Sequence, residues 1–213
     1  MQLVEKYRPM TLDDVCGQDR AVATVRRMTA RGLAGRAYWI SGPSGSGKTT
    51  LARIIANEVA SEWDTEEIDS QGLTVANVRD LDQRLNLRGL CGRGRAVILN
   101  EAHALRKDVI RFLLVALERI PPHAIWAFTT TAQGQGKLFE DCIDADPLLS
   151  RCTTVTLAPA TDLYEPFAER ARTIAQAEGL DGRPMADYVR LAHAHKGNLR
   201  AMLQQIEAGV MAK

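Results

Sequence analysis

The chain has 213 residues, of which 46% are hydrophobic and 25% are charged, and its formal net charge at pH 7 is +1. This composition is typical of a globular protein with a real core, and the near-neutral charge excludes nucleic-acid binding through overall basicity. No apolar run reaches the length of a membrane span and the N-terminus lacks a signal-peptide core, so we expect a cytoplasmic protein, or a nuclear one in a eukaryote.

From residue 38 onward, short apolar runs alternate with helical patterns. This order predicts an α/β fold with a mostly parallel sheet flanked by helices. The predicted strands cover residues 38–41, 66–69, 96–99, 124–130 and 153–157. The predicted helices cover residues 49–60, 75–85 and 107–119, and two prolines end the last of them.

The connection between the first strand and the first helix fits the pattern G-x-x-x-x-G-K-[ST] over residues 42–49, the phosphate loop. Strand, glycine-rich turn and helix, in that order, are the context of a phosphate-binding site. Its N–H groups converge on an anion that the helix N-terminus also attracts. Lys48 would pair with the β- and γ-phosphates, and the Thr49 hydroxyl would ligate Mg²⁺. We therefore expect a nucleoside triphosphate to contact Gly42, Pro43, Ser44, Gly45, Ser46, Gly47, Lys48, Thr49 and Thr50.

Two polar residues, Asn100 and Glu101, end the third predicted strand. Ligands of such sheets bind beyond the carboxyl ends of the strands, so both would face the γ-phosphate. The usual pattern is Asp-Glu, in which the aspartate holds the Mg²⁺ shell and the glutamate orients and deprotonates the attacking water. Glu101 fits the second role. Asn100 should weaken metal retention, because Mg²⁺ prefers charged oxygen ligands, although an amide oxygen can still accept from a metal-bound water.

After residue 157 the pattern becomes wholly helical, and Ala-Pro-Ala at residues 158–160 is typical of a hinge. We predict two domains: an α/β nucleotide-binding domain over residues 1–157 and a small helical lid over residues 158–213. The lid is too small to be very stable alone and would bury its apolar faces against the first domain.

Three helices are expected in this lid. Asp162 and Glu165 have the spacing of a capping box that opens the first helix, and Gly179 closes it. The second helix starts near Pro184, and Asn198 caps the third.

Two arginines could supply the positive charge that phosphoryl transfer needs. Arg151 stands just before the last predicted strand, and Arg200 stands in the first turn of the last predicted helix. Taken alone, either residue also fits a solvated surface arginine.

The N-terminal segments 5–9 and 12–18 resemble the opening of the small subunits of replication factor C-type sliding-clamp loaders, which are AAA+ ATPases. The resemblance extends through the phosphate loop and residues 100–103, 150–152 and 197–200, so it covers essentially the whole chain. It implies a P-loop AAA+ domain followed by a helical lid, with ATP and Mg²⁺ as cofactors. The adenine pocket would be lined by Tyr7, Arg8, Pro9, Val15 and Cys16.

The resemblance also implies roles for the catalytic residues. Arg151 would be an arginine finger that reaches into the site of the adjacent subunit, and Arg200 would be a second sensor that contacts the γ-phosphate. The first sensor would fall at Thr130 or Thr131, and we favour Thr131 because its hydroxyl can hold the attacking water. The predicted catalytic set is Lys48, Glu101, Thr131, Arg151 and Arg200, and the predicted metal ligands are Thr49 and Asn100.

The sequence departs from the family's pattern in three places. Asn100 replaces an aspartate, which puts the rate of hydrolysis in doubt more than binding. An acidic insertion at residues 134–146 either adjusts the subunit interface or is a plain exposed loop. Family members continue into a third helical domain, the oligomeric collar, which we expect to be absent here.

The implied partners are a sliding clamp, primer-template DNA and other AAA+ subunits, in a homo- or hetero-oligomer, with no membrane. Basic residues on helices would contact the DNA backbone, although each also fits an ordinary solvated face. The candidates are Arg79, Arg84, Arg106, Lys107 and Arg111.

The expected function is therefore that of an ATP-hydrolysing clamp-loader subunit, in which ATP at subunit interfaces drives clamp loading on primed DNA. Two alternatives stay open, because a fold alone does not fix a function. One is a nucleotide-binding subunit with little hydrolysis because of Asn100. The other is a different DNA-associated AAA+ remodeller.

Overall fold

A parallel sheet organises the computed structural model, which describes residues 1–89, 93–131, 134–135 and 144–212. Its strands lie in the order β2-β3-β4-β1-β5, and every paired neighbour is parallel, which confirms the predicted fold class. The strands are β1 (Arg36–Ser41), β2 (Ala60–Asp69), β3 (Gly94–Asn100), β4 (Ala124–Thr130) and β5 (Cys152–Thr156).

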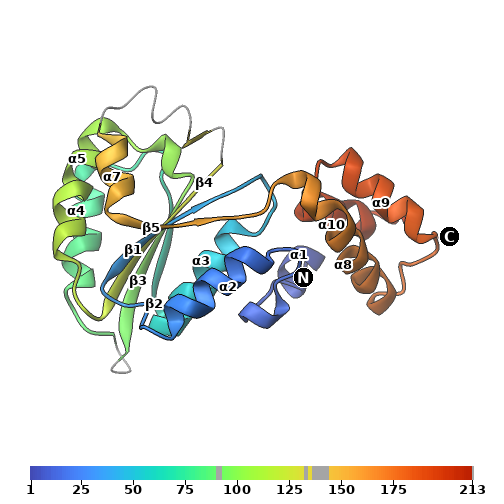
Figure 1. The fold of residues 1–213 in the computed structure, drawn as a ribbon, viewed down its shortest axis with the longest axis horizontal. Coiled ribbons are helices and arrows are strands. Elements are labelled where there is room, and N and C mark those ends of the chain that lie inside the picture. The colour runs from blue at the N-terminus through green and yellow to red at the C-terminus, as the bar shows by residue number, and fades with distance from the viewer. Residues whose placement is uncertain (90–92, 132–133, 136–143, 213) are drawn as a thin grey trace.

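Helices cover both faces of the sheet (Figure 1). The helices α2 (Asp19–Thr29) and α3 (Lys48–Val59) pack on one face. The opposite face carries α4 (Val75–Leu85), α5 (Lys107–Ala116) and the short α7 (Ala145–Ser150). The result is a three-layer arrangement of helices, sheet and helices.

Successive side chains of a strand serve two separate cores, because neighbouring residues of a strand point to opposite faces. In β1, Tyr38 and Ile40 pack in the cluster under α2 and α3. Ala37 and Trp39 pack in the cluster under α4, α5 and α7. Burial on both faces explains why β1 and β4 are continuous apolar runs that sequence patterns reveal easily.

The edge strand β2 is longer than predicted. We expected only residues 66–69, whereas β2 begins at Ala60, directly after α3 ends at Val59. In the part of the chain that the structure describes, β2 pairs only with β3, and Trp63 is 84% exposed. Edge strands often carry polar and charged residues, so the alternation of apolar and polar residues that predicts a strand is weak in them.

The boundaries of other elements also differ from the prediction. The helix expected over residues 107–119 ends at Ala116, and its last turn is a 3₁₀ helix over Leu117–Arg119. Within the described residues, three α-helices were not predicted, namely α1 (Leu3–Lys6), α2 and α7. The first and last are too short to show a helical period. The buried residues of α2 do follow such a period and could have predicted it.

The chain after the sheet forms α8 (Tyr164–Ala177), α9 (Met185–Ala194) and α10 (Leu199–Glu207), the C-terminal helices. They share an apolar cluster of their own, which also includes Leu3 of α1. Figure 1 shows them at the end of the molecule opposite α4 and α5. The division into two domains at residue 157 stays a prediction.

The N-terminal ends of these helices test two predicted caps. The capping box at Asp162 and Glu165 is wrong, because a 3₁₀ helix, Ala160–Leu163, occupies that segment and α8 starts only at Tyr164 without a side-chain cap. Pro166 lies in the first turn of α8, where its missing N–H costs nothing. The cap at Asn198 is confirmed, since its Oδ1 accepts a hydrogen bond of 3.1 Å from the Ala201 N–H.

Gly179 follows the end of α8 with a φ of +70°, as predicted for the residue that closes the helix. Among the described residues, no helix combines the length and the apolar character that a membrane span requires. Most of the acidic insertion, residues 136–143, lies outside the described residues.

Candidate nucleotide-binding site

One pocket brings together segments from both ends of the chain. The phosphate loop, the N-terminal segment and Glu101 line it on one side, and α8 and α10 line it on the other. Fourteen of the predicted site residues lie in its wall: Tyr7, Arg8, Pro9, Val15, Cys16, Ser44, Gly45, Ser46, Gly47, Lys48, Thr49, Thr50, Glu101 and Arg200.

Five predicted residues do not line this pocket: Gly42, Pro43, Asn100, Thr131 and Arg151. The first two form the base of the phosphate loop, where the Gly42 N–H donates to the Thr130 carbonyl at 3.3 Å. An added Cβ at Gly42 would approach the Leu157 side chain to 2.7 Å, so only glycine fits there without a shift.

The loop has the backbone conformation that its glycines permit. Gly45 and Gly47 have φ values of +71° and +103°, in the left-handed region that other residues avoid. The helix α3 begins at Lys48, directly after the second of them. The first four N–H groups of an α-helix have no intrahelical acceptor, so they face the loop with the positive end of the helix dipole. This donor set fits a phosphate chain.

Lys48 is buried at the floor of the pocket, and its Nζ donates to the Pro43 carbonyl at 2.8 Å. Burial lowers the pKa of the Lys48 ammonium, and the nearby Glu101 carboxylate opposes this effect. A buried ammonium is costly to desolvate unless an anion compensates it. Lys48 is thus suited to pair with a polyanion that enters the loop.

Asn100 lies at the end of β3, next to the loop, and both the oxygen and the nitrogen of its side-chain amide form hydrogen bonds. Its Oδ1 accepts hydrogen bonds from the hydroxyls of Thr49 at 3.0 Å and Thr129 at 2.8 Å. Its Nδ2 donates to Glu67 Oε1 at 2.9 Å. The two predicted metal ligands, Thr49 and Asn100, are therefore in direct contact.

Glu101 follows with a φ of +53°, which is uncommon for a residue other than glycine. Such backbone strain concentrates at functional sites, where the surrounding structure holds it. The Glu101 Oε2 lies 3.4 Å from His103 Nδ1, which in turn lies 3.3 Å from Thr130 Oγ1. The strained turn after β3 directs this carboxylate into the pocket wall.

The two candidates for the first sensor differ in their surroundings. The side chain of Thr130 is buried and contacts His103. Thr131 Oγ1 accepts a hydrogen bond of 3.0 Å from the Gly134 N–H. The assignment to Thr131 stays a prediction.

The other end of the pocket is largely apolar, with Val15, Cys16 and Phe167 in its wall. Burial raises the pKa of the Cys16 thiol, which therefore stays neutral. Tyr7 donates its hydroxyl to Glu178, and this hydrogen bond raises the pKa of Tyr7. An apolar wall of this kind suits a flat base.

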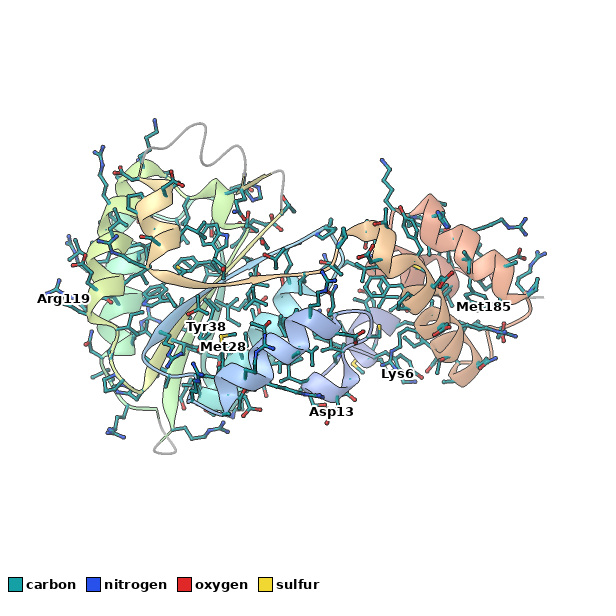
Figure 2. All side chains as sticks on the ribbon, viewed as in Figure 1. Lys6, Asp13, Met28, Tyr38, Arg119 and Met185 are labelled. Carbon is teal, nitrogen blue, oxygen red and sulfur yellow. The ribbon has the colours of Figure 1, made fainter. Side chains whose placement is uncertain are left out.

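Glu178, directly after α8, accepts hydrogen bonds from both Tyr7 and Lys6, the second at 2.6 Å. These contacts connect α1 to the end of α8. Figure 2 labels Lys6 at the junction with the C-terminal helices. Lys6 and Tyr7 lower the pKa of Glu178 by hydrogen bonding to its charged form. The Glu178 carboxylate therefore stays charged at neutral pH, and its hydrogen bonds to Lys6 and Tyr7 weaken when acid protonates it.

Nine residues of the pocket wall were not assigned from the sequence as site residues, and two of these, Gln18 and Arg170, have polar side chains. Gln18 is buried, donates to the Ser46 carbonyl at 3.1 Å and accepts from the Ala158 N–H at 2.8 Å. Arg170 of α8 lines the pocket near Cys16 and Tyr7. Gln18 ends a segment that carries the family resemblance, which is a usable signal, whereas no short-range pattern marks Arg170.

Arg151 lies between α7 and β5 and does not line the pocket. Its Nη2 lies 2.5 Å from Glu118 Oε1, and its Nη1 donates to the Pro147 carbonyl at 2.9 Å. Both charged side chains are partly exposed, so this ion pair is weak and easily exchanged.

The candidate DNA-contacting residues lie on or next to α4 and α5, which pack against each other. Most of them have partners within the chain. Arg84 pairs with Glu66 and Asp80, Arg106 with Asp108, and Arg111 with Asp144. The guanidinium of Arg79 lies 5.7 Å from the ring centre of Phe112. Contact with DNA stays a prediction.

Comparison with known proteins gives results consistent with this geometry. A family model described as "ATPase family associated with various cellular activities (AAA)" matches residues 38–156. The replication factor C small subunit of Haloarcula marismortui is 30% identical and aligns with 96% of this chain and 61% of its own length. The DNA polymerase III subunit tau of Escherichia coli is 27% identical over 98% of this chain and 34% of its own length.

A similar solved structure is the RuvB Holliday junction branch migration motor of Thermotoga maritima. Its TM-score is 0.70 at 25% identity, and the match covers 94% of this chain and 64% of that one. The chain spans about three fifths of the replication factor C small subunits that it matches.

Proposed function

Since the chain belongs to the AAA family of ATPases, we propose that it binds and hydrolyses ATP as a subunit of a DNA sliding-clamp loader. In this proposal ATP lies at a subunit interface, and its binding closes an oligomer around a sliding clamp and primer-template DNA. Hydrolysis then releases the clamp and the DNA. The protein would act in the cytoplasm, or in the nucleus of a eukaryote.

One observation supports the proposal above all others. The phosphate loop, Glu101 and Arg200 come from separate parts of the chain, and all of them line one pocket. A triphosphate in the loop would have Lys48 beneath it, and Arg200 of the lid would reach its γ-phosphate. The apolar end of the pocket would hold the adenine.

The residues present fit a magnesium ion, which binds oxygen ligands and usually keeps several waters. Thr49 Oγ1 and Asn100 Oδ1 lie 3.0 Å apart at the mouth of the loop, so both could face one ion or its water shell. When bound, Mg²⁺ neutralises charge on the phosphates. Glu101 would orient the attacking water and accept its proton, and Thr131 would help to hold that water.

The position of Arg151 supports action between subunits. This arginine does not line the pocket of its own chain, and it is held by a weak, partly exposed ion pair with Glu118. In a ring or spiral it would leave Glu118 for the γ-phosphate of a neighbour. Positive charge at that point stabilises the transition state of phosphoryl transfer and raises the rate of hydrolysis by several powers of ten.

Mixing two inactive variants tests this arrangement. Glu101→Gln and Arg151→Ala should each lower ATP turnover at least a hundredfold. A mixture should recover part of the turnover, because some interfaces then combine an intact Glu101 with an intact Arg151 from the other chain. No recovery in a mixture that light scattering shows to be co-assembled would contradict an arginine supplied by a second copy. Arg31→Ala, at an exposed arginine outside the proposed site, provides a charge-matched control for Arg151→Ala.

A second candidate function is supported by the structural similarity to the RuvB branch migration motor. Such a remodeller would respond to branched DNA instead of a clamp. Turnover measured with primed duplex plus a sliding clamp, and separately with a four-way junction, separates the two functions. We expect stimulation by the clamp and primed duplex; stimulation by the junction alone would favour the second candidate.

A further inference from the structure

We propose that Glu67 is a positioning residue for the magnesium site, which acts by holding Asn100 so that its amide oxygen faces Thr49. This inference rests on the proposed ATP and Mg²⁺ binding. Glu67 lies on the edge strand β2 and does not line the pocket itself.

The contact follows from the register of the sheet. Glu67 pairs with Ile98 of β3, and Asn100 stands two residues further along the same face of β3. Diagonal neighbours of this kind are within reach of long side chains. The carboxylate of Glu67 accepts a 2.9 Å hydrogen bond from Asn100 Nδ2.

The polarity of Glu67 determines which way the amide points. A carboxylate can only accept, so Asn100 must turn its NH₂ group toward Glu67 and its oxygen toward the opposite side. On that side the oxygen accepts from the hydroxyls of Thr49 and Thr129. The reversed amide would set two oxygens against each other near Glu67. Glu67 thereby keeps an oxygen ligand directed at the Thr49 hydroxyl.

Glu67 is itself held in place. Arg53 of α3 donates two hydrogen bonds to its carboxylate, at 2.6 Å and 3.1 Å. The same helix begins with Lys48 and Thr49, so this pair joins β2 to the helix that carries the phosphate loop. Groups that orient a metal ligand in this way commonly change metal affinity ten- to a hundredfold when removed.

The arrangement also explains why an amide at residue 100 suits this chain. An aspartate there would face the Glu67 carboxylate at about hydrogen-bonding distance, and like charges so close disfavour each other. Restoring an aspartate at residue 100 should therefore not repair metal retention by itself.

The test measures the Mg²⁺ concentration that half-maximally tightens binding of a fluorescent ATP analogue. Glu67→Ala should raise this concentration about tenfold. Glu67→Gln should stay near the unchanged protein, because its amide oxygen still accepts from Asn100 Nδ2. The matched control is Glu66→Ala, which removes a neighbouring β2 carboxylate paired with Arg84. Affinity for the analogue in excess chelator should be the same in all variants, which separates metal effects from misfolding.

Two outcomes overturn the proposal: Glu67→Ala shifts the Mg²⁺ requirement no more than Glu66→Ala, or Glu67→Gln shifts it as much as Glu67→Ala. Either leaves the proposed function standing, provided that the unchanged protein binds the analogue. If the unchanged protein binds no nucleotide, the proposed function fails first and this inference fails with it.

A pair of substitutions extends the test. Asn100→Asp should lower the Mg²⁺ requirement more in a Glu67→Gln background than in the unchanged chain, because the repelling carboxylate is then neutral. Equal shifts in the two backgrounds would show that residues 67 and 100 act independently, and would overturn the proposal.

Discussion

Gly45 of the phosphate loop lies against the start of α10. A Cβ added there would lie 1.9 Å from Asn198 Oδ1, the atom that caps α10. Its φ of +71° also lies in the region that side chains disfavour. At this position the motif therefore serves two purposes, a tight turn for phosphate and close contact with a distant helix.

We predict that Gly45→Ala lowers the free energy of unfolding by about 2 kcal/mol. Left-handed backbone costs a residue with a side chain about 1 kcal/mol, and displacing Asn198 removes a cap worth about 1 kcal/mol. Gly32→Ala is the matched control, because Gly32 has a φ of +84° and nothing within 4 Å of an added Cβ. Urea denaturation measures both variants. An equal loss of unfolding free energy in the two variants would contradict this prediction, because it would show that displacing the Asn198 cap has no cost.

At the scale of elements, Gln18 links three segments that are far apart in the chain. It joins the N-terminal segment to Ser46 of the phosphate loop and to Ala158, which follows the sheet. Both partners are backbone groups, so the link fixes the path of the chain and does not depend on their side chains. The position of α8 and α10 over the loop depends partly on this residue.

We predict that Gln18→Leu lowers the free energy of unfolding by about 2 kcal/mol, because it leaves a carbonyl and an N–H in the interior without partners. It should also weaken nucleotide binding, since Ser46 is no longer held. Gln83→Leu on the exposed face of α4 makes the same chemical change and should stay within about 0.5 kcal/mol of the unchanged protein. Chemical denaturation provides the comparison, and similar values for the two variants would contradict the role given to Gln18.

For the whole molecule, the pocket exists only because the sheet and the C-terminal helices meet. Lys48 comes from one side and Arg200 from the other. A ligand that contacts both sides binds only the folded arrangement, so it should stabilise the protein as a unit.

We predict that a non-hydrolysable ATP analogue with Mg²⁺, at about one hundred times its Kd, stabilises the chain by about 2.7 kcal/mol. Thermal unfolding with and without the analogue measures this as a rise in Tm. Lys48→Ala should abolish the rise and Arg200→Ala should reduce it, while Lys107→Ala should keep it. An undiminished rise in Lys48→Ala would show that the analogue binds elsewhere.

The sequence alone predicted those features that neighbouring residues encode. The phosphate loop is a contiguous motif, and its glycines specify the turn wherever the flanking strand and helix form. The buried strands β1, β3 and β4 and the cap at Asn198 were predicted for the same reason. Where the local signal is weak the prediction failed, as in the polar first half of β2 and in the capping box at Asp162.

Only the tertiary structure decided how Glu67, Gln18 and Arg170 relate to the site. Each acts across a distance in the chain that no periodicity or spacing records. The register of β2 against β3 brings Glu67 to Asn100, and the packing of α8 brings Arg170 to the pocket. Local backbone preferences depend on adjacent residues, whereas these contacts depend on how complete elements pack against one another.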